Sequence, residues 1–413
     1  MIKKSFISIK EINKKNILKI IIEQKSISRI DISKLLKISR PTVSAYVSDL
    51  IEEDLIIEFG KNSSTSLGGK KAVLLKFNHD AGYIISVSIG VLKIRAAITN
   101  LGTRVISLME TKTEEEKGSE FVIKKVINLI NKLLRKNEEI KEKIIGIGIA
   151  CTGLVDSWNG EVIFSPNLTG WSNIPLRNIV EGKINLPTFI ENECRIIAIA
   201  EKQYGLAKNI ENFVCFLAGR GIGTGVFMNN KLVVGEKGLA GEIGHLTTDL
   251  ESNRQCHCGG IGCLEAISST ATLLDEINNE INAKKENKLE KDEELCLEDL
   301  YRLYEQGDKI VEKHVNENAR LIGLGISNTI KIFNPQLVII NGSPIKFGQK
   351  YMDIVRETVA KATFPKVKGN YNIQFSRLGD RVKIIGASAY VFEKIFNLEN
   401  LNLANEYMVK KNI

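Results

Sequence analysis

The N-terminal 77 residues carry apolar side chains at a spacing that predicts three short helices, over residues 10–24, 30–36 and 40–53. The second helix follows a Ser-Arg-Ile-Asp sequence at 28–31, which resembles a capping box with Asp in place of Glu. Ser39 is expected to cap the third helix, and Pro41 is tolerated in its first turn. The side chains expected to face the core are Ile32, Leu35, Leu36, Val43, Tyr46, Val47, Leu50 and Ile51.

Two strand-like runs follow, at 55–59 and 71–77, and a polar loop that is basic at both ends separates them. This hairpin would be the wing of a winged helix-turn-helix, whose second helix enters the DNA major groove. Residues 1–77 are therefore predicted to bind DNA, although three-helix units also serve as protein-docking domains. The side chains expected to contact DNA are Ser39, Arg40, Thr42 and Ser44 in the third helix and Lys61, Lys70 and Lys71 in the wing.

From residue 80 onward, strand-like and helix-like runs alternate to the end of the chain, which indicates α/β layers. Residues 82–102 contain two strand-like runs with a turn at 100–102, helical spacing covers 121–134, and 144–150 is an apolar run typical of a buried strand. No run approaches 18 uninterrupted apolar residues, and the N-terminus has no long apolar run or small-residue cleavage site. We therefore expect no membrane span and no secretion.

The 413 residues allow two or three domains, and the 43% hydrophobic and 26% charged content is that of an ordinary soluble protein. The charge, however, is unevenly spread. Residues 1–76 hold 15 Lys and Arg against 8 Asp and Glu, a net charge of +7, whereas the whole chain carries only +8. A basic unit on a nearly neutral body is typical of a DNA-binding head, and the asymmetry favours that reading over protein docking.

Residues 238–265 gather three of the seven cysteines and two of the four histidines. His245, Cys256, Cys258 and Cys263 form the one-His, three-Cys donor set that tetrahedral Zn²⁺ takes in structural sites. His257 is expected to point outward, away from this set. Buried free thiols are the alternative, but two cysteines one residue apart in a Gly-rich polar loop make a poor apolar core. The odd number of cysteines and their clustering favour reduced thiols in the cytoplasm.

The sequence Gly-Leu-Ala-Gly-Glu-Ile-Gly-His at 238–245, followed by Cys-x-Cys-Gly-x-x-Gly-Cys-x-Glu at 256–265, resembles the signature of the ROK family of repressors, open reading frames and kinases. This resemblance covers essentially the whole chain. It implies an α/β fold, with the N-terminal winged helix-turn-helix followed by a two-lobed, actin-like domain of the sugar kinase/ribonuclease H-like kind. The first lobe would span 80–191, with 383–413 packing back on it, and the second lobe, with the zinc loop, would span 192–382.

The resemblance also implies a sugar pocket between the lobes. Carboxylates and amides suit such a pocket because each buried sugar hydroxyl must find a hydrogen-bonding partner. Asn192 could instead be a helix cap, and His245 would serve both the zinc ion and the sugar. The residues that match pocket positions of the family are Gly153, Asn167, Asn192, Glu193, Glu242, His245 and Glu265.

Two departures argue against kinase activity. Kinases of the family carry Asp-x-Gly-Gly-Thr where residues 88–92 read Ser-Ile-Gly-Val-Leu, and a catalytic Glu-Asn-Asp where 191–193 read Glu-Asn-Glu. The extra methylene of Glu193 shifts the carboxylate by roughly 1 Å, which can reduce a positioned proton transfer by about 10²-fold. The Gly-rich run at 219–225 is weak evidence for a phosphate site, and Arg220 either binds an anion or faces solvent.

The prediction is a cytoplasmic, sugar-responsive transcriptional repressor without enzymatic activity, which binds operator DNA as a homodimer or higher homo-oligomer, carries structural Zn²⁺ and does not contact membranes. The Glu-Asn-Glu sequence, the wing and the missing nucleotide motif most resemble the xylose-repressor branch, so D-xylose is the first expected effector. Two alternatives stay open: a hexose kinase that retains ATP-dependent phosphorylation beside DNA binding, and a zinc-responsive regulator that uses the cysteines as its sensor.

Overall fold

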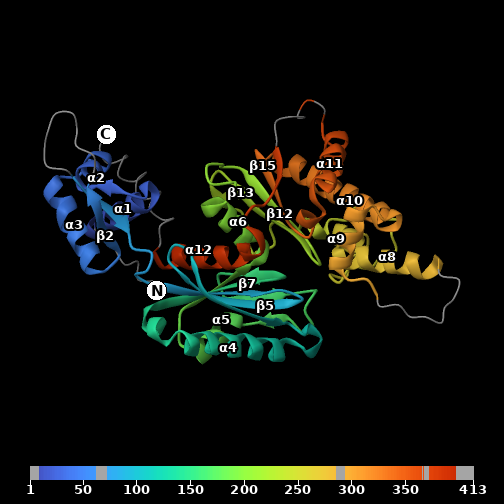
Figure 1. The fold of residues 1–413 in the computed structure, drawn as a ribbon, viewed down its shortest axis with the longest axis horizontal. Coiled ribbons are helices and arrows are strands. Elements are labelled where there is room, and N and C mark those ends of the chain that lie inside the picture. The colour runs from blue at the N-terminus through green and yellow to red at the C-terminus, as the bar shows by residue number, and fades with distance from the viewer. Residues whose placement is uncertain (1–8, 62–71, 285–293, 365, 367–371, 397–413) are drawn as a thin grey trace.

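The computed structural model describes residues 9–61, 72–284, 294–364, 366 and 372–396. It shows an N-terminal head and two α/β lobes, with one long C-terminal helix running between them (Figure 1). Within these residues, no helix combines the length and the apolar character that crossing a membrane requires.

The head is a three-helix unit with a small antiparallel sheet of order β1-β3-β2. Its elements are α1 (Ile9–Gln24), β1 (Ile27–Ser28), α2 (Arg29–Leu36), α3 (Arg40–Glu52), β2 (Ile56–Lys61) and β3 (Val73–Phe77). The two predicted caps form: the hydroxyl of Ser28 accepts the N–H of Asp31, and that of Ser39 accepts the N–H of Thr42. The pattern did not predict β1, which pairs with β3.

The core of the head follows the predicted pattern with one exception. Ile32, Val43, Val47 and Leu50 are buried, and Tyr46, Ile51 and Leu36 are partly buried. Leu35, which was expected to face inward, is 59% exposed. Ile32 and Leu36 lie one turn apart and face the core, and Leu35 is rotated from Leu36 by about 100°, so it points outward.

The first lobe is built on a five-stranded sheet of order β11-β7-β4-β5-β6, in which β4, β7 and β11 are parallel and β4, β5 and β6 form an antiparallel meander. A second sheet, of order β10-β9-β8, lies beside it. The strands are β4 (Tyr83–Ile89), β5 (Lys93–Asn100), β6 (Val105–Lys112), β7 (Ile144–Cys151), β8 (Leu154–Asp156), β9 (Glu161–Phe164), β10 (Ser172–Ile174) and β11 (Thr188–Asn192); the helices are η1 (Glu115–Lys117), α4 (Ser119–Lys136), η2 (Glu138–Lys143) and α5 (Leu176–Ile184).

The expected hairpin within 82–102 forms as β4 and β5, but the turn at 100–102 leads from β5 into a third strand, β6, which the pattern did not predict. Helix α4 covers the lower face of this sheet in Figure 1 and buries Val122, Val126 and Ile130 against it. The upper face is covered by α12 (Val382–Phe396), which contacts β4 and β7.

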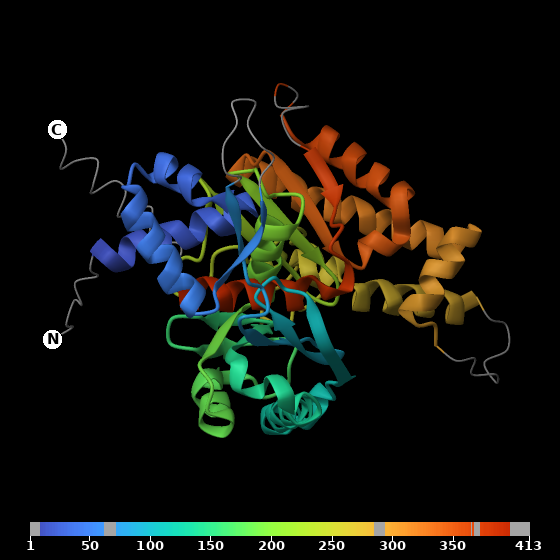
Figure 2. The same cartoon turned by 60° about the vertical axis from the view of Figure 1, so that its left-hand side comes forward.

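The second lobe has a five-stranded sheet of order β14-β13-β12-β15-β16. Helix α6 lies on one of its faces, and the long helix α10 crosses α7, α8, α9 and α11 in the outer layer. Figures 1 and 2 both show α12 between the two lobes, where it also packs against α6. The elements are α6 (Glu193–Tyr204), β12 (Phe213–Ala218), β13 (Ile222–Met228), β14 (Lys231–Leu232), η3 (Ile243–His245), α7 (Leu264–Ser268), α8 (Thr270–Lys284), α9 (Leu297–Gln306), α10 (Lys309–Phe333), β15 (Leu337–Gly342), α11 (Pro344–Ala362), β16 (Asn372–Phe375) and η5 (Gly379–Arg381).

The head shares a hydrophobic core with the rest of the chain. One buried cluster contains Ile17, Val43 and Leu75 of the head together with Val391 and Phe392 of α12. The rings of Phe77 and Phe392 meet edge to face, with centroids 5.7 Å apart. The head is therefore packed directly onto α12 in addition to its covalent link to β4.

Candidate functional site

A small pocket of about 40 Å³ lies between the two lobes, where β7 and β11 of the first lobe end opposite the β12–β13 turn of the second. Polar side chains from five separate stretches of the chain meet at this pocket. All seven residues that the family resemblance implied for a sugar pocket line it: Gly153, Asn167, Asn192, Glu193, Glu242, His245 and Glu265.

Asn192 ends β11 and caps α6. Its Oδ1 accepts the N–H groups of Cys194 and Arg195, at 2.8 and 3.3 Å, and its Nδ2 donates to the carbonyl of Gly153 at 2.8 Å. The side-chain oxygen thus has both acceptor positions filled, and one N–H of the amide remains for a ligand. The helix-cap interpretation of Asn192 is therefore correct, and it is compatible with a place in the pocket wall.

Glu193 is the first residue of α6, and its carboxylate forms an ion pair with the amine of Lys383 at the start of α12. No sequence pattern connects these two residues, which lie 190 positions apart. The carboxylate therefore already has a cationic partner while it lines the pocket.

Two further carboxylates face the pocket from the second lobe. Glu265, in the first turn of α7, accepts the N–H of Ile222 at 2.7 Å and the amide of Asn167 at 3.3 Å. Burial raises the pKa of Glu242 to about 7, and the neighbouring carboxylates of Glu265 and Glu193 act in the same direction. The pocket thus offers acceptors from Glu193 and Glu265 and, near neutral pH, a carboxyl group at Glu242 that can also donate.

A buried ion pair holds the pocket wall together. Arg195 and Glu191, 1% and 2% exposed, are joined through Nε and Oε1 at 2.6 Å. The other guanidinium nitrogens of Arg195 donate to the carbonyls of Gly238 and Val155, at 2.9 and 3.0 Å. Arg195 thus ties the start of α6 to the 238–245 loop and to β8. No sequence pattern marked Arg195 as a partner of Glu191, because Glu191 lies in β11 and Arg195 on α6, so the i,i+4 pairing of a single helix does not connect them.

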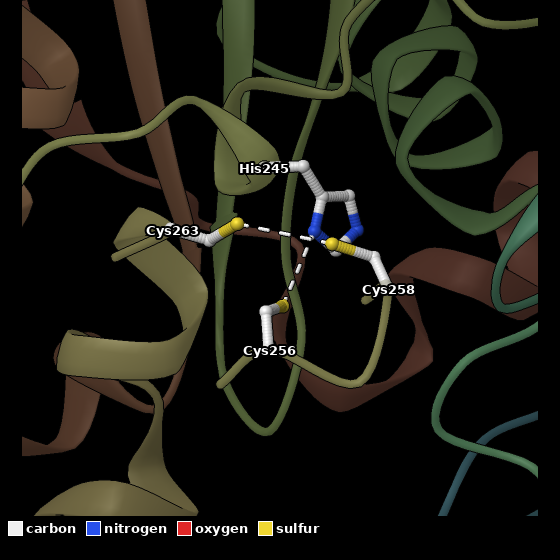
Figure 3. Close-up of side chains that lie close together, drawn as sticks. All are labelled: His245, Cys256, Cys258 and Cys263. Atoms are coloured by element: carbon white, nitrogen blue, oxygen red, sulfur yellow. Dashed lines mark hydrogen bonds between the residues drawn. The ribbon is translucent and has the colours of Figure 1, made fainter. Parts of the chain in front are cut away.

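The four predicted metal ligands lie together, and their side chains point toward one another (Figure 3). The ligand atoms of His245, Cys256, Cys258 and Cys263 all lie within 4.8 Å of each other. Two separations are particularly informative: Nδ1 of His245 is 3.6 Å from Sγ of Cys256, and Sγ of Cys258 is 3.8 Å from Sγ of Cys263.

These separations fit a tetrahedral ion. Zn–S bonds of about 2.3 Å and Zn–N bonds of about 2.0–2.1 Å place ligand atoms roughly 3.6–3.8 Å apart along the edges of a tetrahedron. Burial raises the pKa of the Cys256 and Cys263 thiols, so both are protonated near neutral pH unless a cation is bound. The donor set and its geometry therefore fit a divalent ion of the zinc type.

His257 lies outside this cluster, as expected, but it does not simply face solvent. Its Nδ1 lies 3.1 Å from Oδ1 of Asn167, a pocket residue from the first lobe. Arg220, in the β12–β13 turn of the second lobe, also contacts the first lobe: its Nη1 lies 3.8 Å from a carboxylate oxygen of Glu115 in η1. All four residues line a larger cavity of about 590 Å³, which adjoins the small pocket and shares Asn167 with it.

In the head, Ser39, Arg40 and Ser44 are exposed at the N-terminal end of α3. Thr42 is partly buried, and its hydroxyl is hydrogen-bonded to the hydroxyl of the cap residue Ser39. Among the described residues, Arg40 has no carboxylate within ion-pair distance, so its guanidinium is available to an external anion. Lys70 and Lys71 lie outside the described residues. Lys61 is the last residue of β2, and its side chain lies outside the described part of the structure.

Known proteins match both parts of the chain. The sequence profile of the ROK family matches residues 84–394, and that of a winged helix-turn-helix DNA-binding domain matches residues 10–57. The xylose repressor of Caldicellulosiruptor bescii is 33% identical over 392 residues, which cover 94% of this chain and 97% of that protein.

Solved structures give the same division. A ROK family transcriptional regulator, a homologue of the E. coli MLC protein, aligns with a TM-score of 0.79 and 25% identity over 96% of this chain and 98% of its own. A ROK family glucokinase from Streptomyces griseus, in complex with glucose and AMPPNP, aligns with a TM-score of 0.67 and 25% identity, over 75% of this chain and 99% of its own. The alignment with the regulator is thus long enough to include the head as well as the lobes, whereas the glucokinase accounts for only three quarters of the chain.

Proposed function

The chain belongs to the ROK family, and from that premise we propose that it is a sugar-responsive transcriptional repressor that acts on genes of carbohydrate use. The observation that carries the proposal is the union, in one chain, of a winged helix-turn-helix head with an interlobe pocket lined by three carboxylates, two amides and an imidazole. Such a head would bind operator DNA, which supports a location in the cytoplasm.

A neutral sugar is the ligand that best suits the pocket. Glu193 and Glu265 accept hydrogen bonds from hydroxyl groups, and the free N–H of Asn192 donates. The identity of 33% with a protein named xylose repressor supports D-xylose as the effector to test first.

Phosphoryl transfer is not part of the proposal. Where kinases of the family carry an Asp for the nucleotide phosphates, this chain has Ser88, which is buried at the end of β4. Val91 and Leu92 occupy the following turn, where small residues would let phosphate approach the backbone. The carboxylate of Glu193 is also engaged by Lys383, so it is not a free base.

His245, Cys256, Cys258 and Cys263 would hold Zn²⁺ in a structural role. A closed set of four protein ligands leaves no open coordination position for a reaction. The ion would fix the loop that carries His245 and, through Cys263, the N-cap of α7, two residues before Glu265, and so shape the pocket wall. This arrangement favours structural zinc over a catalytic ion.

Operator binding would require two heads. Winged helix-turn-helix dimers read half-sites about 34 Å apart, or a multiple of that distance. We therefore include a homodimer or a higher homo-oligomer in the proposal, with both recognition helices α3 placed by the bodies that carry them.

The test is fluorescence anisotropy on DNA from the protein's own promoter region, titrated with D-xylose, D-glucose and related pentoses and hexoses. Salt must be fixed, because phosphate contacts make affinity fall steeply as salt rises. Specific binding that one sugar changes at plausible concentrations supports the proposal and names the effector. Specific binding that no sugar changes contradicts the sugar response. If specific binding is absent but ATP is consumed in the presence of a sugar, the protein is a kinase.

A further inference from the structure

We propose that Lys383 is a positioning residue that couples sugar binding at Glu193 to the DNA-binding head through helix α12. The inference rests on the proposed function, because it concerns how an occupied pocket changes operator affinity. It is supported by three sets of contacts along α12: an ion pair beside the pocket, close packing of the middle of the helix against both lobes, and a hydrophobic core that its last turns share with the head.

The first contact is at the pocket. Glu193 lines it and is ion-paired with Lys383, the second residue of α12. The two side chains are 11% and 27% exposed, so the pair is shielded from solvent over most of its surface. Lys383 does not itself line the pocket, and its link to a bound sugar passes through the Glu193 carboxylate.

The second set of contacts makes α12 move as one unit. A Cβ on Gly386 would lie 2.1 Å from the carbonyl oxygen of Ile196 in α6, so the two helices touch backbone to backbone. On the opposite side, the hydroxyls of Ser388 and Thr99 are buried and 2.7 Å apart. Because close-packed elements have no free volume in which to deform, a displacement at one end of α12 is transmitted along it.

The third contact is at the head. Val391 and Phe392 belong to the same buried cluster as Ile17 and Val43, which come from α1 and the recognition helix α3. The ring of Phe392 also meets the ring of Phe77, the last residue of β3, at 5.7 Å. The last turns of α12 are therefore part of the head's own core, and a shift of α12 alters the placement of α3.

A sugar can shift this system only if its affinity differs between two positions of α12. The Glu193–Lys383 pair provides that difference. A sugar hydroxyl that draws the Glu193 carboxylate into the pocket weakens its bond to Lys383, whereas the intact pair holds the first turn of α12 against α6. The sugar therefore binds more strongly to the arrangement in which α12 has moved.

The test compares the full-length wild type with Lys383→Met in two separate measurements. Calorimetry gives the sugar affinity without DNA, and anisotropy gives the ratio of operator affinities with and without saturating sugar, at fixed salt. For the wild type, a coupling of about 5- to 150-fold is the usual range. For Lys383→Met we expect the sugar to bind and the ratio to fall close to one. Lys383→Arg keeps the cation and should keep most of the ratio.

Lys361→Met is the matched control, because it removes a Lys–Glu ion pair of the same kind from the exposed face of α11. It should leave the ratio at the wild-type value. If Lys383→Met does not fold, Lys383→Gln, whose amide still donates a hydrogen bond without a charge, is measured in the same way and should also lower the ratio.

The outcomes are distinguishable. If no sugar changes the operator affinity of the wild type, the proposed function fails, and this inference fails with it. If the wild type responds and the Lys383 variants respond equally, only the inference is wrong. If the variants bind operator but lose sugar binding, Lys383 belongs to the pocket rather than to the coupling, and the inference is again overturned.

Discussion

Arg195 and Glu191 form a buried ion pair inside the pocket wall, in which Nε of Arg195 donates to the carboxylate at 2.6 Å. The other two guanidinium nitrogens of Arg195 donate to two backbone carbonyls. Both residues are almost fully inaccessible to solvent. The guanidinium therefore has partners on three different segments.

Replacement of Arg195 with Met should destabilise the fold, because it leaves the Glu191 carboxylate buried without its partner. Removal of one member of a buried pair typically costs about 3–5 kcal/mol. Urea unfolding measures the loss. Arg320→Met, which removes an exposed pair with Glu317, is the control and should change the free energy of unfolding by no more than about 1 kcal/mol. Equal effects of the two substitutions would contradict the role given to Arg195.

Cys258→Ser should lower the zinc content from about one ion per chain and destabilise the protein, because metal binding and folding are coupled. Elemental analysis and thermal unfolding, with and without a chelator, measure both effects. Cys296→Ser is the control, since Cys296 is exposed at the start of α9 and outside the cluster. A Cys258→Ser protein that stays as stable as the wild type and loses only regulation would favour the sensor alternative.

Glu265→Gln should weaken sugar binding while operator affinity without sugar stays unchanged. The substitution replaces a charged acceptor that also holds Ile222 and Asn167 in place. Loss of a hydrogen bond to a charged group costs about 1.5–3 kcal/mol, or roughly 10- to 150-fold in affinity. Calorimetry with the effector sugar provides the measurement. An unchanged sugar affinity would place the sugar elsewhere.

Arg40→Ala should weaken operator binding by about 1–3 kcal/mol if the guanidinium reads a base. If it contacts a phosphate, affinity should fall for all sequences alike and the salt dependence should become shallower. Anisotropy on operator and on scrambled DNA separates these cases. Lys331→Ala, an exposed charge on α10, controls for the change in net charge. No loss relative to that control would exclude Arg40 from the interface.

His79 should make the protein less stable in acid. Burial, and then the charge of Lys76, lower its pKa below the usual value of 6.5. The unfolded chain therefore takes up this proton more readily than the folded chain. The stabilising contribution is present above about pH 6.5 and is lost as the pH falls below it. His79→Gln should show a smaller loss of unfolding free energy between pH 7 and pH 5 than the wild type.

Features encoded within a short stretch could be predicted from the sequence. The four metal-ligand residues were predicted because all of them lie within 19 positions of the chain. The helix caps Ser28 and Ser39 were predicted because each side chain caps the helix that directly follows it. The pocket residues came from the resemblance to the family, and the structure gathers all seven around one cavity.

Contacts between distant segments were not predictable in this way. Lys383 meets Glu193 from 190 positions away, and no local pattern marks either residue for the other. The exposure of Leu35 was also not predictable from the sequence. The spacing of apolar residues does not show which face of a short helix the rest of the protein will cover. The strand β6 was missed because its apolar residues do not mark its buried face: Ile106 and Leu108 are exposed, whereas the buried residue between them is Ser107.

The core shared by the head and α12 has a consequence for biosynthesis. The head leaves the ribosome before α12 does, because Phe392, which packs against Phe77, is translated about 300 residues later. At about 5–20 residues per second, that delay is roughly 15 to 60 s. A nascent or prematurely terminated chain therefore carries a recognition helix whose supporting core is incomplete, and truncated products are poor competitors for the operator.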